Sequence, residues 1–140
     1  MRPDASHSQE TRLIDVVFPD RANHYGTLFG GNALHPMDKA AFIAATRHSR
    51  QHVVMASSDN ITFDEPVRVG DLVECVASIA RVGGASMTVA VEFIHEDALI
   101  GLRRSAVRGT FEMVAVDANG RPTRISESHG RSEIQEEAVL

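Results

Sequence analysis

The stretch AAFIAAT, residues 40–46, forms the centre of the one long segment of this sequence that has a helical pattern. Alanine has the highest helix propensity, and apolar residues here occupy nearly every face of a helix, which is typical of a buried one. We therefore predict a buried helix over about residues 33–48. Pro36 lacks a backbone donor and fits only near a first turn, so the ordered helix is expected to begin close to it, with 30–32 (GGN) leading in.

The segments on both sides of this helix have the patterns of strands. On the N-terminal side, residues 13–18 are apolar and end at a Pro-Asp pair. On the C-terminal side, four segments have strand patterns, and they cover residues 53–63, 72–82, 85–94 and 99–116. Short connections favour antiparallel pairing. The pair Gly83 and Gly84 indicates a hairpin whose central residues can adopt positive φ.

These elements predict an α+β fold in which one strand and one buried helix precede four strands in meander order. A single helix covers only one face of such a sheet. The other face and the edges are therefore expected to be covered by a second copy of the chain.

The composition narrows the class of protein. The chain has 140 residues, 43% of them hydrophobic, and a formal net charge of -5, which suits one apolar core and gives no support to nucleic-acid binding. The single Cys75 excludes an intrachain disulfide framework and a cysteine-cluster zinc site. The polar N-terminus lacks the apolar core of a signal peptide, and no apolar run approaches the roughly 18 residues that span a bilayer. We expect a cytoplasmic protein without a membrane segment, with a flexible arm (1–12), one domain (13–122) and a polar tail (123–140).

Two polar residues near the predicted helix are candidates for chemistry. Asp38 is either a carboxylate with a function on an otherwise apolar helix or, with Lys39, the solvated edge of that helix. Asn23 is either an Asx-turn residue, which its local sequence favours, or a neutral donor to a carbonyl or an oxyanion. Gly30 and Gly31 either form only a tight turn or let a ligand approach the amides at the helix start.

Other reactive residue types form no recognisable site in the sequence. The seven histidines lack the spacing of a metal motif, and the loops that bind nucleotides or carry a serine nucleophile are absent, so we expect neither a metal nor a cofactor. Cys75 lies in a predicted strand and is interpreted as an inert core residue. Ser57, Ser58 and Arg81 are interpreted, from the pattern alone, as polar positions on strands.

Five motifs, taken together and in order, resemble the hotdog-fold acyl-CoA thioesterases, and most of all the group that includes YciA-like and brain acyl-CoA hydrolase-type proteins. The similarity covers roughly residues 13–122. The motifs are FPDRANHYGTLFGG (18–31), MDKAAFIAATRH (37–48), VVMASSDNITFDEPVRVGDLVE (53–74), RVGGASMTVAVEF (81–93) and GTFEMVAVDANGRP (109–122). Three positions depart from the family pattern: Pro36 before the Met-Asp pair, and Met55 and Ser58 where the family strand has Thr and Val.

The resemblance implies a curved antiparallel sheet wrapped around one long helix. It also implies a homodimer with active sites at the subunit interface, often assembled into a hexamer as a trimer of dimers. Asn23 and Asp38 fall on the catalytic residues, which come from opposite subunits, and the backbone of Gly30 and Gly31 falls on the loop that faces the thioester oxygen. The further substrate-binding positions that it implies are Ser57 and Ser58 on the channel strand and Arg81, Gly83, Ser86 and Met87 on the CoA side.

The function implied by this resemblance is hydrolysis of acyl-CoA to a free carboxylic acid and CoA. Two alternatives on the same fold remain open. One is a protein that binds or senses acyl-CoA without catalysis, and the other is an enoyl-CoA hydratase. None of the three requires a metal, a nucleic acid or a membrane partner.

Overall fold

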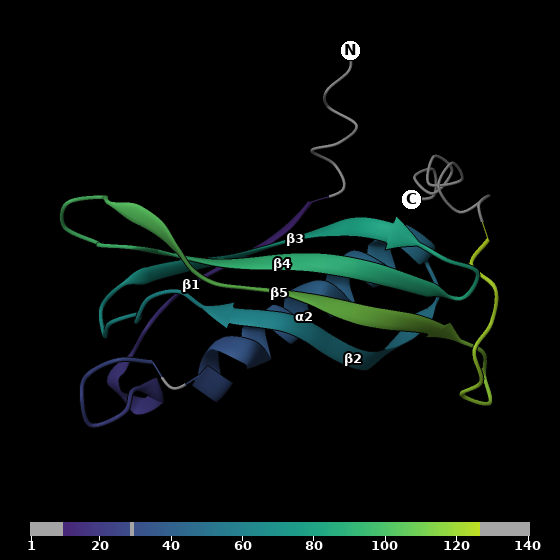
Figure 1. Cartoon of the computed structure of the whole chain (residues 1–140), viewed down its shortest axis with the longest axis horizontal. Helices are drawn as coiled ribbons and strands as arrows, with labels where there is room; N and C mark the ends of the chain where they lie inside the picture. The colour runs from purple at the N-terminus through teal and green to yellow at the C-terminus, as the bar shows by residue number, and fades with distance from the viewer. Residues whose placement is uncertain (1–9, 29, 127–140) are drawn as a thin grey trace, which may run out of the picture.

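The computed structural model describes residues 10–28 and 30–126, and within them one long helix lies against one sheet (Figure 1). The elements in chain order are β1 (Thr11–Val16), the 3-10 helix η1 (Pro19–Arg21), α2 (Gly30–Ser49), β2 (His52–Phe63), β3 (Leu72–Val82), β4 (Ser86–Glu96) and β5 (Arg103–Val116). The predicted α+β class is confirmed. No helix in the described part of the chain is long and apolar enough to cross a membrane.

The order of the strands differs from the predicted meander. All pairs are antiparallel, but the sheet runs β1-β3-β4-β5-β2, so β2 pairs with β5 rather than with its neighbour in sequence, β3. The connection over residues 64–71 is long enough to cross from one side of the sheet to the other, and β1 takes the place beside β3. Both β1 and β2 are therefore edge strands.

The helix begins earlier than predicted. Its first residue is Gly30, so Pro36 lies inside the helix rather than at its start. The first four amides of any helix lack a partner within it, and Pro36 removes only one further bond, which would have joined its nitrogen to the carbonyl of Asn32. The alanine-rich segment that follows has enough helix propensity and burial to continue past this missing bond.

The core lies between α2 and the concave face of the sheet. Along β4 the residues Met87, Val89, Val91 and Phe93 are buried, while the residues between them are only partly so, which confirms the predicted alternation. The helix contacts all five strands through a face of small residues, mainly alanines. Small side chains let the helix approach the sheet closely, and the large side chains of the strands fill the remaining space.

The hairpin between β3 and β4 is confirmed, but not the backbone conformation expected for it. The amide of Gly83 donates to the carbonyl of Ser86 at 2.7 Å, which closes the turn. Neither Gly83 nor Gly84 has a positive φ. The bond between Gly83 and Ser86 makes Gly84 and Ala85 the two central residues of the turn, rather than Gly83 and Gly84.

The segments at the two ends of the described chain are partly tied to the domain. β1 begins at Thr11, inside the predicted arm, and the rest of that arm up to residue 9 lies outside the described residues. After β5, the amides of Thr123 and Ile125 donate to the carbonyls of Ala115 and Gly84, and Ile125 is buried. Of the predicted tail, residues 123–126 thus pack on the sheet, and 127–140 lie outside the described residues.

Candidate active site

The loop over residues 22–28, which we call the Asn23 loop, is built around the side chain of Asn23. Its Oδ1 accepts hydrogen bonds from the amide of Tyr25 at 2.9 Å, the amide of Thr27 at 3.2 Å and the Oγ1 of Thr27 at 3.1 Å. The backbone amide of Asn23 also donates to the carbonyl of Thr27 at 2.7 Å. The bond from the amide of Tyr25 to Oδ1 closes the Asx turn that the local sequence favours.

This arrangement determines which end of the Asn23 amide is free. Because three donors surround Oδ1, the nitrogen Nδ2 must point the other way, and no described residue accepts a hydrogen bond from it. The side chain is only partly buried. The two interpretations of Asn23 are therefore compatible: the oxygen shapes the loop, and the shaped loop presents a neutral N–H donor.

The first turn of α2 lies next to this loop. The side-chain nitrogen of Asn32 donates to the carbonyl of Arg21 at 2.8 Å, which ties the helix start to the end of η1. Gly30 and Gly31 are exposed, and the amides of a first helical turn have no acceptor within the helix. Free amides and the positive end of the helix dipole are suited to an anionic or partly anionic oxygen.

Asp38 lies two turns further along α2. It is eight residues past Gly30, or about 12 Å along the axis at the rise of an α-helix. Its side chain is partly buried, and no described residue forms a hydrogen bond or an ion pair with its carboxylate. Its neighbour Lys39 is exposed, but Met37 and Ala40 on either side of the pair are buried. Asp38 therefore offers an unpaired carboxylate at the boundary between the core and the surface.

The other candidate residues do not gather around Asn23 within one chain. Arg81 and Gly83 are exposed and Ser86 is partly buried at the β3–β4 turn, whereas the Asn23 loop lies beside the start of β3. The eleven residues of β3 place these two regions about 30 Å apart, at opposite ends of the molecule in Figure 1. Met87 is fully buried in the core, so its contact with a substrate stays a prediction. Ser57 and Ser58 are exposed on the edge strand β2.

Comparison with known proteins identifies the family. The model of the thioesterase superfamily matches residues 25–101. The chain belongs to this superfamily. It is 34% identical over 125 residues to an uncharacterized acyl-CoA thioester hydrolase of Bacillus subtilis, covering 88% of this chain and 73% of that protein. The resemblance found in the sequence motifs is thereby confirmed.

Solved structures show the same fold in acyl-CoA hydrolases. An acyl-CoA hydrolase of Staphylococcus aureus in complex with butyryl coenzyme A superposes with a TM-score of 0.81 at 27% identity, covering 96% of this chain and 88% of that one. An acyl-CoA hydrolase of Agrobacterium tumefaciens is 42% identical with a TM-score of 0.78; the match covers 84% of this chain but only 46% of that one. The five-stranded sheet around one helix is the hotdog fold of this family.

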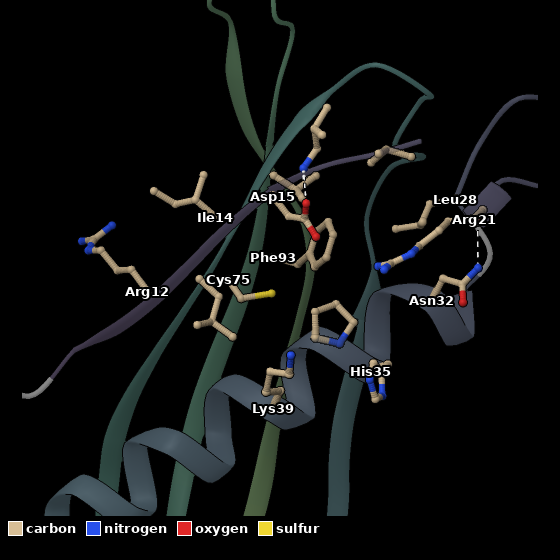
Figure 2. A pocket seen from close by; sticks show the side chains of 15 residues that line it. Arg12, Ile14, Asp15, Arg21, Leu28, Asn32, His35, Lys39, Cys75 and Phe93 are labelled. Carbon is tan, nitrogen blue, oxygen red and sulfur yellow. Dashed lines mark hydrogen bonds between the residues drawn. The ribbon is translucent and has the colours of Figure 1, made fainter. Parts of the chain in front are cut away.

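A cavity of about 380 Å³ lies between β1 and the first half of α2 (Figure 2). Its lining includes His35, Lys39, Cys75 and Phe93, and it includes neither Asn23 nor Asp38. Burial raises the pKa of the Cys75 thiol to about 12, so the thiol stays neutral and is a poor nucleophile. The interpretation of Cys75 as an inert core residue therefore fits its surroundings.

Sequence reasoning missed the residues that support the Asn23 loop in this thioesterase-superfamily chain. Thr27 supplies two of the three donors to Asn23, and Asp71 and His95 bind each other at 3.0 Å beside the segment that pairs with the loop. The Val-Gly-Asp sequence that ends at Asp71 is typical of a turn, but the long-range contact of Asp71 with His95 has no local signal. Within the described residues, no group of three or more His, Cys, Asp or Glu side chains is placed to hold a metal ion.

Proposed function

We propose that this protein hydrolyses the thioester bond of acyl-CoA. Water adds its oxygen to the acyl carbon, the carbon–sulfur bond breaks, and the products are a carboxylic acid and the thiol of CoA. A thioester is already an activated acyl group, so the scheme uses no metal or cofactor. The observation that carries the proposal is the Asn23 amide, whose oxygen is held by the loop while its nitrogen is left free to donate.

Asn23 and the start of α2 supply the electrostatic part of the mechanism. When water or a carboxylate attacks the thioester, negative charge develops on the carbonyl oxygen. The Nδ2–H of Asn23 and a backbone N–H near Gly31 donate to that oxygen, and the positive end of the helix dipole adds to their effect. Because the loop fixes the amide before substrate arrives, little reorganisation is needed during the reaction.

Asp38 supplies the attacking group in this scheme, either as the base that activates water or as the nucleophile itself. Its unpaired carboxylate suits both roles. Solved variants of the Staphylococcus aureus hydrolase include one with an asparagine and one with an aspartate replaced by alanine, and the interval between those two positions equals the interval between Asn23 and Asp38. This equal spacing supports the same pair here.

A third variant of the same hydrolase supports a difference between that enzyme and this chain at the position of Met55. The S. aureus hydrolase was also solved with a threonine replaced by alanine, and that threonine follows the aspartate by the interval that separates Met55 from Asp38. Met55 is exposed on β2 and carries no hydroxyl group. Any hydrogen bond that a threonine makes to substrate at this place is therefore not part of the mechanism proposed for this chain.

The proposal requires a homodimer with shared sites. The edge strand β2, which pairs only with β5 among the described strands, exposes Val54, Met55 and Phe63. Phe42 on α2 is exposed as well, so an apolar surface runs along one edge of the chain. A two-fold axis beside β2 brings the Asn23 loop of one subunit toward Asp38 and the β3–β4 turn of its partner. Within a single chain, the Asn23 loop lies apart from both. One solved acyl-CoA thioesterase of this fold is described as hexameric, which supports further assembly into a trimer of dimers.

The β3–β4 turn and the exposed strand β2 then have roles in binding. In the dimer, Arg81, Gly83 and Ser86 of one subunit flank the CoA portion of the substrate, while Ser57 and Ser58 border its channel. A cytoplasmic location is part of the same proposal, since the only cysteine of the chain is a buried free thiol, as is usual in a reducing compartment.

The test is CoA release from a panel of acyl-CoAs of increasing chain length, followed by the appearance of free thiol. We expect turnover with at least one member and no requirement for added metal. Binding of acyl-CoA without thiol release would instead identify a non-catalytic binding protein. With an enoyl-CoA substrate, loss of the conjugated thioester absorbance without thiol release would identify a hydratase.

A further inference from the structure

The Asn23 loop is held in place by a second segment, residues 67–71, through backbone hydrogen bonds. The amide of Leu28 donates to the carbonyl of Val67 at 2.7 Å, and the amide of Val69 donates to the carbonyl of Gly26 at 3.0 Å. Further along, Val17 and Gly70 are joined by a bond of 2.9 Å. The position of Asn23 relative to the sheet therefore depends on where this second segment lies.

The 67–71 segment is itself closed by the side chain of Asp71. Its Oδ2 accepts a hydrogen bond from the amide of Arg68 at 3.0 Å, and the amide of Asp71 donates to the carbonyl of Arg68 at 3.0 Å. The same carboxylate oxygen lies 3.0 Å from Nδ1 of His95, near the end of β4. Asp71 thus joins a turn in a loop to a residue of the sheet.

His95 lies close to two carboxylates, and one of these carboxylates is also approached by an arginine. Its ring lies between the carboxylates of Asp71 and Glu65, with Nε2 at 3.5 Å from Glu65, and Arg104 reaches the same Glu65 oxygen at 3.9 Å. The side chains of His95 and Asp71 are only 14% and 12% exposed. The Nε2 atom is buried without a hydrogen bond, so the contact with Asp71 is the one hydrogen bond that the described residues give this ring.

We propose that His95 is a positioning residue for the reaction, acting through Asp71 and the 67–71 segment on the Asn23 loop. The inference rests on the proposed function, because the contact between His95 and Asp71 affects the reaction only if Asn23 donates a hydrogen bond to the oxyanion. The physical reason is that β4 is a central strand, and among the described residues no other side-chain hydrogen bond joins it to either of the two loops. A displacement of about 1 Å of a donor costs up to about 10²-fold in rate.

The kinetic test compares two substitutions that separate packing from hydrogen bonding. His95→Leu keeps most of the volume and loses the N–H, while His95→Asn loses volume and keeps a donor near the place of Nδ1. We expect His95→Leu to lower kcat by about tenfold with KM within about twofold, and His95→Asn to retain at least half of kcat. The reverse ranking would mean that His95 serves only to fill space, and it would overturn the proposal.

A second comparison links His95 to Asn23. In a chain that already carries Asn23→Ala, His95→Leu should cause no further loss of kcat, since the group that it positions is gone. Equal losses in both backgrounds would show that His95 acts elsewhere. The matched control is Arg103→Ala, which breaks ion pairs to Glu74 and Glu96 at the same end of the sheet without a contact to either loop. Its kcat should stay within twofold of wild type.

A readout that needs no catalysis tests the physical link directly. Hydrogen exchange followed by mass spectrometry should show faster exchange in His95→Leu for the peptides that contain Leu28 and Val69, with no change in peptides from the middle of β4 and β5. Unchanged exchange in both loops would overturn the proposal. If no acyl-CoA releases CoA with the wild-type protein, the proposed function fails, and the exchange result still decides whether His95 holds the loop.

Discussion

Replacement of Asp38 by alanine is expected to lower kcat for CoA release by at least about 10²-fold, because the scheme then lacks its base or nucleophile. The fold should persist, since the carboxylate makes no hydrogen bond or ion pair to a described residue and alanine favours a helix. The measurement is steady-state thiol release, together with thermal unfolding of both proteins.

Lys39→Ala is the matched control for this substitution. Lys39 is the next residue on the same helix, is exposed and has no part in the scheme, so its kcat should remain close to that of wild type. An absence of CoA release by the wild-type protein with every acyl-CoA of the panel would remove the hydrolase interpretation. Retention of more than a third of kcat by Asp38→Ala would remove Asp38 from the mechanism.

Replacement of Asn23 by aspartate is expected to lower kcat by about 10² to 10³-fold while leaving the stability of the protein nearly unchanged. The aspartate keeps an oxygen that accepts the hydrogen bonds of Tyr25 and Thr27, so the loop is preserved. It replaces the free N–H donor by an anionic oxygen, which repels the developing oxyanion. This substitution therefore separates the two roles that the structure gives to one side chain.

Asn23→Ala is the comparison for that prediction, because it removes the acceptor as well as the donor. It should be as inactive as Asn23→Asp. It should also unfold at a lower temperature, because each hydrogen bond left without a partner lowers the free energy of unfolding by about 1 kcal/mol. If Asn23→Asp retained activity while Asn23→Ala lost it, Asn23 would be a loop-shaping residue alone and the oxyanion donor would lie elsewhere.

Local patterns were sufficient to predict the elements of this fold, but not how they pair. The period-two alternation along β4 and the alanine-rich centre of α2 each reflect a single buried face, which a short window of sequence reveals. The choice between β3 and β5 as the neighbour of β2 depends on contacts between segments far apart in the chain. No pattern within β2 itself favours β5 over β3 as its partner.

The candidate site was predictable to a similar degree. Asn23, Gly30 and Gly31 lie close together in sequence, and the glycine-rich turn before a helix is a local signal. The support of that turn is not local: Asp71 and His95 lie far along the chain and approach it only because β3 and β4 pair beside β1. The proposed sharing of one site by two chains has no signal in periodicity, and it was inferred from the family resemblance.

The most direct test of the central claim is to mix two inactive variants, Asn23→Asp and Asp38→Ala, by co-expression or joint refolding. If each site combines Asn23 of one subunit with Asp38 of its partner, a mixed dimer contains one intact site and one doubly altered site. About half of randomly paired dimers are mixed, so CoA release should recover to about a quarter of the wild-type rate. If mass spectrometry confirms mixed dimers and the activity stays at the level of the separate variants, the shared site does not exist.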